Sequence, residues 1–332
     1  MPTFKVTLAY DGTDFVGWQR QASGTSIQGL LERALRDLDG HDVTVHGAGR
    51  TDAGVHAFGQ VASFALNRSI GAAELLRAVN ARFPESVRIV SAEEVSASFH
   101  ARFGATRKVY RYRIWNAGLL SPFERAYSWH VPAPLDTGAM HEAAIVLQGR
   151  HDFAAFQASG SATRSSVREV FLSTVLVNGR LVSRGGHTSP SGSDVFHPPH
   201  PADQSHPPDQ PDPHDRSDAI FPTASSFFVV GSAGVDVEPV AGGEGRDDAA
   251  LSRCRHGGAL VEYEVTGDGF LRHMVRNMVG SLVEVGRGRR PVEWISTVLV
   301  GRDRTLAGPT APPHGLVLVS VEYGVRSLAA DR

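Results

Sequence analysis

The sequence predicts an α+β fold in which two lobes are built on a largely antiparallel β-sheet. Segments with the two-residue periodicity of strands alternate with segments that have the 3.6-residue periodicity of amphipathic helices. Several strand segments follow one another with only a turn between them, which is typical of hairpins. A doubly wound parallel sheet is not predicted, because each of its crossovers needs a helix. The length of 332 residues is typical of about two domains.

Residues 1–98 are predicted to form the N-terminal lobe. Thr25 or Ser26 is placed to cap a helix at 27–38, in which apolar residues recur every three or four positions. The polar, glycine-containing stretch 11–25 is predicted to be a loop. The other elements expected here are strands at 3–10, 43–49, 59–66 and 87–95, a loop at 50–57 and a helix at 72–83.

The C-terminal lobe is predicted to consist of residues 99–186 and 251–326. Its expected elements are strands at 108–115, 167–177, 259–265 and 316–324 and helices at 137–148 and 270–285. On the first of these strands, alternation places Lys108, Tyr110 and Tyr112 on one face. Tyrosines in strands usually pack in a core. An aromatic face beside cations also suits stacking on nucleic acid bases, so both interpretations stay open.

The cysteine content and the apolar runs indicate the compartment. The single Cys254 excludes an internal disulfide framework and a cysteine-based metal cluster, which is consistent with a reducing environment. The N-terminal segment alternates like a strand and lacks the apolar core of a signal peptide. No uninterrupted apolar run reaches the ~18 residues that a membrane helix needs. We therefore expect a cytoplasmic protein with no membrane contact.

Residues 187–250 differ in composition from the rest of the chain. Nine of the nineteen prolines lie between Pro190 and Pro222, and His, Asp, Ser and Gly fill the gaps. Such a segment cannot bury an apolar core, so we predict a disordered insertion. Because it lies between two strand-like segments, we interpret it as a hairpin loop that has grown very long.

The insertion contains five histidines, at positions His187, His197, His200, His206 and His214. They lack the fixed local spacing of a structural metal site, and we expect a solvated segment. Metal binding or docking of a partner by this segment is kept as a possible added function.

The charge is unevenly distributed along the chain. The formal net charge is -2, but the insertion holds nine Asp and two Glu against two Arg. The rest of the chain therefore has 31 basic and 24 acidic residues, a formal charge of +7. Only Lys5 and Lys108 are lysines, and guanidinium groups suit forked phosphate contacts. Codon bias explains the arginine excess equally well, so the charge permits a nucleic acid partner without requiring one.

The segment GAGRTDAGVHA, residues 47–57, combines three glycines with Arg50 and Asp52 between two strand-like runs. Glycines there let the backbone turn tightly, and a rigid scaffold can aim Asp52 from the end of a strand. The spacing lacks the third glycine of a dinucleotide fingerprint and the Gly-Lys-Ser/Thr of a P-loop, so neither phosphate-binding device is predicted. Taken alone, an Asp in such a turn is commonly structural.

The segment GDGFLRHMVRNMVGSLVEVG, residues 267–286, has a broad apolar stripe that is typical of a core helix. Arg272 and Arg276 are four positions apart and are predicted to share another face of this helix, with His273 close by. A solvated polar face is the ordinary explanation. At the edge of a buried stripe, however, Arg276 could keep a carboxylate ionised by pairing with it.

Five segments together carry a resemblance to a known family: YDGTDFVGWQRQ, GAGRTDAGVHA, FHARFGATRKVYRYRI, GDGFLRHMVRNMVGSLVEVG and RDRTLAGPTAPPHGLVLVSVEY. In this order they closely resemble the tRNA pseudouridine synthase A (TruA) family. The resemblance spans nearly the whole chain outside 187–250, which is its main departure from the usual pattern. It implies the pseudouridine synthase fold, with two ferredoxin- or RRM-like lobes and a central cleft.

The resemblance also implies an activity and roles for single residues. The expected enzyme is a cofactor-free and metal-free isomerase that converts uridine to pseudouridine at positions 38, 39 and 40 of tRNA, in the anticodon arm. Asp52 matches the catalytic aspartate, which acts as a nucleophile or through a glycal, and Arg276 matches the arginine that pairs with it. Tyr110 matches the tyrosine that stacks on the base, and Arg50 the arginine that helps to extrude it. We also expect Arg272 and His273 in substrate binding, and a homodimer that binds one tRNA through both subunits.

Physical chemistry agrees with these roles. A uridine in a stem must leave its stack before its sugar can react, and an aromatic ring with a guanidinium group offsets that cost. A carboxylate in a water-poor cleft stays ionised at neutral pH when a fixed arginine pairs with it. Two alternatives stay open: a pseudouridine synthase that acts on other RNA sites, and a non-catalytic RNA-binding protein.

Overall fold

The computed structural model describes residues 1–158, 160, 165–182 and 258–324. They all belong to one unit of the chain, residues 1–187 and 256–332. The predicted insertion 187–250 lies outside the described residues, and its predicted disorder stays a prediction, as does the lobe boundary after residue 98.

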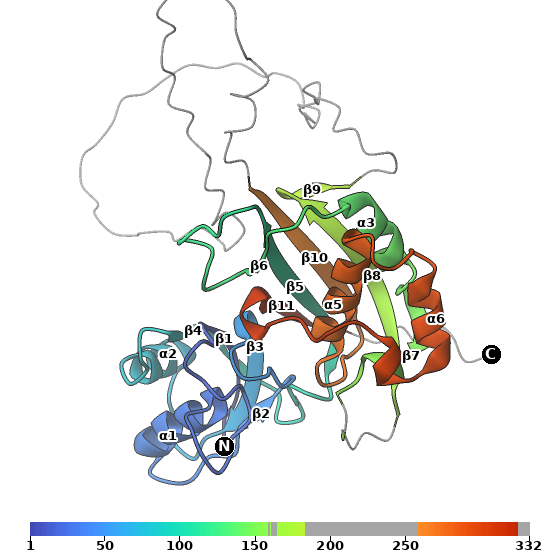
Figure 1. Ribbon diagram of the computed structural model, residues 1–332. Coiled ribbons are helices and arrows are strands. Elements are labelled where there is room, and N and C mark those ends of the chain that lie inside the picture. Colours follow the sequence, from blue (N-terminus) through green and yellow to red (C-terminus); the bar gives the residue numbers. More distant parts are fainter. Residues whose placement is uncertain (159, 161–164, 183–257, 325–332) are drawn as a thin grey trace, which may run out of the picture. The chain divides into compact units, whose positions relative to one another are not determined.

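The described strands form one eleven-stranded sheet (Figure 1). They are β1 (Thr3–Tyr10), β2 (His46–Gly47), β3 (His56–Ala65), β4 (Val87–Val95), β5 (Ala105–Asn116), β6 (Trp129–Val131), β7 (Gly149–Asp152), β8 (Val167–Val177), β9 (Arg180–Leu181), β10 (Ala259–Gly267) and β11 (Leu316–Tyr323). Their main order is β4-β1-β3-β11-β5-β10-β8-β7, while β2, β6 and β9 pair with β3, β5 and β8. Only the β11–β3 and β5–β6 pairs among the described strands are parallel, which confirms the predicted α+β class with a largely antiparallel sheet.

Helices accompany both halves of the sheet. The α-helices are α1 (Ile27–Asp39), α2 (Ala72–Asn80), α3 (Thr137–Ile145), α5 (Met274–Gly286) and α6 (Trp294–Gly301), and the 3-10 helices are η1 (Ala154–Phe156), η3 (Arg304–Leu306) and η4 (Pro313–Gly315). Figure 1 shows α1 and α2 beside β1, β3 and β4, and the remaining α-helices beside β8 and β10. None of the helices in the described part of the chain is long and apolar enough to cross a membrane.

The N-terminal elements follow the predicted pattern closely. Ser26 caps α1, and its hydroxyl accepts a hydrogen bond from the backbone N–H of Gly29 at 3.2 Å. Along β1 every second residue is buried, with Phe4, Val6 and Leu8 fully inside. This alternation places one face of the sheet against α1 and leaves the other to the polar residues.

The last described strand joins the two halves of the sheet. β11 pairs in parallel with β3, where Val317 lies opposite His56, and antiparallel with β5, where Leu318 lies opposite Tyr110. The C-terminal segment therefore brings the start of β3, which follows Asp52, next to the strand that carries Tyr110.

The strands before and after the predicted insertion are neighbours. β8 and β10 are antiparallel, and Val177 lies opposite Val261, which agrees with a hairpin whose connection has become very long. The segment after β8 also turns back on itself, because Asn178 and Gly179 have positive φ angles of 50° and 77° and lead into β9.

Several sequence predictions were wrong in part. The strand expected at 43–49 is reduced to His46–Gly47. The helix expected from residue 270 begins only at Met274, because His273 has the left-handed φ of 63° and cannot continue a helix towards residue 270. The short elements α6, β6 and β7 were not predicted, since their sequences have fewer residues than a clear periodicity requires.

Candidate active site

Asp52 lies in the short loop between β2 and β3, whose backbone is held from several sides. The backbone N–H of Trp18 donates to the Thr51 carbonyl at 3.1 Å, and the Tyr10 and Thr51 hydroxyls are 2.9 Å apart. The Gln60 amide donates to the Gly49 carbonyl at 3.0 Å. Because the residues that precede Asp52 are anchored, its carboxylate projects from a fixed backbone.

Two glycines of the loop 11–25 let that loop approach the Asp52 backbone. A side-chain carbon on Gly12 would lie 2.1 Å from the Val55 carbonyl oxygen. One on Gly17 would lie 2.5 Å from the Thr51 carbonyl oxygen, and Gly17 also has a φ of +100°. The glycines of YDGTDFVGW are therefore part of the support of Asp52, a role that the sequence alone did not reveal.

The Asp52 carboxylate faces two cationic or potentially cationic side chains. Its Oδ2 is 3.4 Å from Nη1 of Arg276 and 3.6 Å from Nε2 of His273. The Asp52 side chain is 27% exposed and that of Arg276 is 13% exposed. Residues more than 220 positions apart in the sequence thus form an ion pair at the edge of the core, and the predicted Arg276–Asp52 pairing is present.

The two partners of Asp52 differ in charge at neutral pH. Burial lowers the pKa of His273, and the nearby guanidinium groups of Arg276 and Arg272 lower it further, against the opposing effect of Asp52. The His273 imidazole is therefore neutral near pH 7, and Arg276 supplies the positive charge beside the carboxylate.

Arg276 is itself held in place. Its Nε donates to the Ala311 carbonyl at 2.7 Å, and the Ala311 N–H donates to the Arg276 carbonyl at 3.1 Å. These two bonds fix the guanidinium group, so that Nη1 stays directed at Asp52.

A buried polar network holds the segment that contains Ala311. The Asn277 side-chain oxygen accepts from the Thr310 hydroxyl at 2.6 Å and from Arg304 at 3.1 Å, and Arg304 also donates to Thr310 at 3.1 Å. Gly280 makes the close packing possible, because a side-chain carbon there would lie 1.6 Å from the Pro309 carbonyl oxygen. The segment RDRTLAGPTAP is part of the family resemblance in the sequence. Its support of Arg276 could not be predicted, because the contacts form only when the chain folds.

Tyr110 lies beside this pair in the core of the sheet. It is 6% exposed, and the ring of Phe270 packs edge-on at 5.1 Å between centroids. Burial raises the pKa of Tyr110, and Tyr10 and Asp52 raise it further, so the phenol is protonated at neutral pH. The neighbouring Tyr112 donates its hydroxyl to the Pro312 carbonyl at 2.8 Å and packs as a core residue.

Arg50 and Arg272 are not brought into contact with Asp52. Both are exposed, and no ion pair or hydrogen bond joins either side chain to the carboxylate within the described residues. Arg272 precedes the first residue of α5, so the helix face that it was predicted to share with Arg276 does not exist. The backbone carbonyl of Arg272 instead accepts from the N–H of Ala158 at 2.9 Å.

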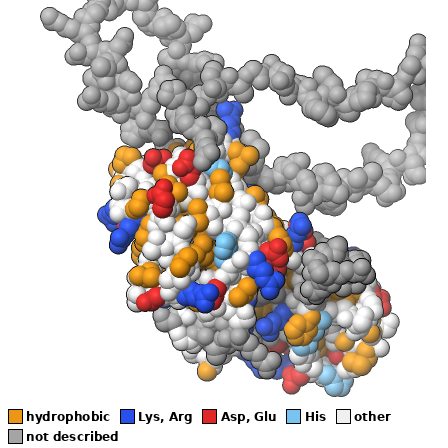
Figure 2. Space-filling view, turned by 90° about the vertical axis from the view of Figure 1, so that its right-hand side faces the viewer, with side chains coloured by type: hydrophobic (Ala, Val, Ile, Leu, Met, Phe, Trp, Pro, Cys, Tyr) orange, Lys and Arg blue, Asp and Glu red, His pale blue; other side chains and the backbone are white. Residues whose placement is uncertain are grey.

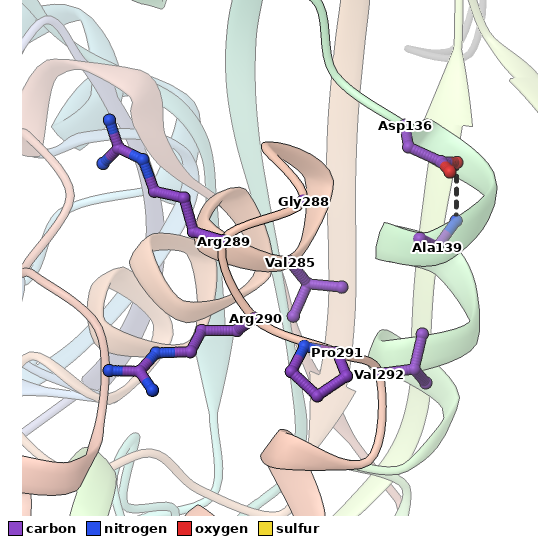
Figure 3. Close-up of a pocket in the computed structure, with 8 residues that line it drawn as sticks. All are labelled: Asp136, Ala139, Val285, Gly288, Arg289, Arg290, Pro291 and Val292. Atoms are coloured by element: carbon purple, nitrogen blue, oxygen red, sulfur yellow. Dashed lines mark hydrogen bonds between the residues drawn. The ribbon is translucent and has the colours of Figure 1, made fainter.

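A hollow of about 390 Å³ between α3 and the segment after α5 lacks a comparable set of reactive groups, and Figure 3 shows the residues that line it. Its carboxylate, Asp136, is occupied in capping α3 by accepting from the Ala139 N–H at 2.9 Å. On the face seen in Figure 2, Lys and Arg side chains occur in several groups with acidic side chains between them. Neither feature brings a carboxylate and a fixed guanidinium group together in the way that Asp52 and Arg276 are brought together.

No group of three or more His, Cys, Asp or Glu side chains in the described ranges is arranged to hold a metal ion.

Comparisons with known proteins connect this geometry to a family. A family model described as tRNA pseudouridine synthase matches residues 7–104 and 243–324, which include Asp52 and Arg276. A tRNA pseudouridine synthase A of Myxococcus xanthus is 38% identical over 323 residues, 97% of this chain and 92% of the relative. One of Moorella thermoacetica is 37% identical over 325 residues, covering 97% of this chain and all of the relative. One of Geobacter sulfurreducens is 36% identical, again over 97% of this chain and the whole relative. The chain therefore belongs to the tRNA pseudouridine synthase family.

Proposed function

We propose that this protein is an isomerase that converts uridine to pseudouridine at positions 38, 39 and 40 in the anticodon arm of tRNA, without a cofactor. The observation that carries the proposal is the Asp52 carboxylate 3.4 Å from the Arg276 guanidinium group, on a rigid loop with the sequence GRTDAGVHA. In the reaction the bond between C1′ and N1 of uridine breaks, and the base turns. A bond forms between C1′ and C5, C5 loses its proton, and N1 gains one.

Asp52 is the catalytic residue in this proposal. Its carboxylate either attacks C1′ of the ribose or promotes loss of a sugar proton to give a glycal, and both routes need the ionised form. Arg276 places a positive charge beside that carboxylate, and its bond to the Ala311 carbonyl directs it. The neutral His273 adds a second polar contact on the same carboxylate oxygen.

Tyr110 provides an aromatic surface for the extruded base. Its raised pKa favours a role as a protonated phenol and a stacking ring over one as an ionised base at neutral pH. Because Phe270 packs against Tyr110 in a T-shaped contact, we expect Phe270 to shift or to stack when a base enters.

Arg50 and Arg272 act on the RNA and not on the carboxylate. Both guanidinium groups are exposed, as contacts to a phosphate backbone require. Arg272 is the neighbour of His273, which contacts Asp52. Arg50 is two residues before Asp52 and takes the place of the stacked base as it leaves the helix. A homodimer that binds one tRNA through both subunits completes the proposal.

The test is a map of pseudouridine in tRNA that lacks the modification, after incubation with the wild-type protein and with Asp52→Asn. We expect pseudouridine at 38, 39 and 40 with the wild type alone, while both proteins bind the tRNA. Modification at other uridines would assign a different substrate, and equal modification by Asp52→Asn would contradict the role of the carboxylate. Sedimentation with and without tRNA tests the dimer.

A further inference from the structure

Lys108 is a partly buried cation beside the active site that the reaction described above does not use. It lies two residues before Tyr110 on β5, so that both side chains point to the same face of the sheet. The strand rise of about 3.4 Å per residue separates the two by about 7 Å along β5. Lys108 is therefore the neighbour, on this face of β5, of the Tyr110 ring on which the base is proposed to stack.

The Lys108 side chain extends along the loop that carries Asp52. A carbon added to Gly49, three residues before Asp52, would lie 3.5 Å from Cε and 3.9 Å from Nζ of Lys108. The absence of a side chain at Gly49 leaves the ammonium group a place beside the backbone of the active-site loop.

The charges around Lys108 are mostly of the same sign. Burial lowers the pKa of Lys108, and Arg102 and Arg168 lower it further, while Asp268 opposes them. Within the described residues, the Lys108 ammonium group has no hydrogen bond and no ion pair shorter than 4 Å. Partly buried cations in proteins are normally paired, because desolvation of an unpaired charge is unfavourable. Lys108, Arg102 and Arg168 outnumber Asp268, so the local charge is positive and an added anion can balance it.

We propose that Lys108 binds the backbone phosphate that adjoins the target uridine, and that this contact positions the ribose over Asp52. The inference rests on the proposed function, since the anion is a phosphodiester of the RNA whose base lies on Tyr110. A phosphate fits because it is the anion that an RNA substrate must bring to this point when its base is extruded. Lys108 binds it as a point charge, and Arg102 and Arg168 strengthen the local field.

Lys5 provides a matched control. It is the other lysine of the chain, lies on β1, and already pairs with Glu93 at 2.7 Å. The Lys5 ammonium group also lies 5.1 Å from the ring centre of Tyr323. A change of Lys5 thus removes the same charge at a place with its own partners.

The first experiment measures the affinity for tRNA against salt in an Asp52→Asn background, with Lys108→Met and Lys5→Met compared. Loss of one phosphate contact should lower the slope of log affinity against log salt by about 0.7 to 0.9. We expect that change, with about 10-fold to 100-fold weaker binding at low salt, for Lys108→Met alone. An unchanged slope for Lys108→Met, or the same change for Lys5→Met, would overturn the proposal.

A second experiment needs no variant and so does not depend on folding. Wild-type protein is treated with an amine-acylating reagent with and without tRNA, and modification at the two lysines is quantified by mass spectrometry. We expect tRNA to protect Lys108 and not Lys5; equal labelling of Lys108 in both samples would contradict a phosphate contact.

A third experiment locates the contact with an anticodon stem-loop that carries one methylphosphonate beside the target uridine. The neutral linkage should weaken binding to a Lys108-containing protein and leave that to Lys108→Met unchanged; equal weakening of both would overturn the proposal.

These outcomes separate the inference from the proposed function. If the wild type forms pseudouridine in tRNA while Lys108 is unprotected and the salt slope is unchanged, only the inference fails. If the wild type modifies no tRNA, the proposed function fails, and protection of Lys108 by RNA still reports whether a phosphate binds there.

Discussion

Replacing Arg276 by Met removes the charge beside Asp52 and keeps most of the volume and the apolar stem of the side chain. At 3.4 Å, the Coulomb energy of the pair is about 5 kcal/mol for an effective dielectric constant of about 20 and about 1 kcal/mol in bulk water. Asp52 is 27% exposed, so the relevant value lies between these limits, at about 3 kcal/mol. The change also removes one of the groups that lower the pKa of His273, although burial, the largest cause, remains.

If the whole of this energy is realised only in the transition state, about 3 kcal/mol corresponds to a fall in kcat of about 10²-fold. The assay is single-turnover formation of pseudouridine in tRNA at saturating enzyme, which separates chemistry from binding. Arg276→Lys is the companion variant: it keeps a charge but has no Nε–H for the Ala311 carbonyl, so we expect an intermediate rate. A rate for Arg276→Met within about fivefold of the wild type would refute the reasoning, because the ion pair would then be dispensable.

Two further predictions concern the support of the site and the response to pH. Gly280→Ala places a carbon 1.6 Å from the Pro309 oxygen, so we expect a loss of about 1–3 kcal/mol in denaturant unfolding together with lower kcat. Gly118→Ala, which meets no atom within 4 Å, should leave both unchanged, and unaltered unfolding of Gly280→Ala would contradict the packing. Burial lowers the pKa of His56 below its ordinary value of 6.5, so the unfolded chain takes up that proton first and stability falls as pH decreases from 6.5 towards the lowered pKa. Thermal unfolding between pH 7.5 and 5 should show a smaller decrease for His56→Gln than for the wild type, and an identical decrease would exclude His56 as a source.

Much of the fold could be predicted because its signals are local. The periodicity of 3–10, 87–95 and 167–177 matches the observed strands residue for residue, and Ser26 caps α1 as its hydroxyl predicts. The helix start at Met274 could not be predicted, because the apolar pattern continues back to Phe270 while the left-handed backbone of His273 depends on its tertiary contacts.

The candidate site was predictable only in its central pair. Asp52 and Arg276 lie in distinctive motifs, and the distance between them confirms that they meet. The supports of the pair were not predictable, because Arg304, Asn277 and Thr310 look like ordinary polar residues until the chain folds. Arg272 was placed on a helix face that does not exist, since periodicity cannot show where a helix begins.

In the proposed reaction, catalysis depends on the Asp52 carboxylate. The most direct test is the release of tritium from tRNA that contains 5-tritiated uridine, because C5 loses its hydrogen when the new bond to C1′ forms. The wild type should release tritium in proportion to the pseudouridine formed, and Asp52→Asn should bind the same tRNA with no release above background. Release by Asp52→Asn at a rate comparable to that of the wild type would contradict the central claim.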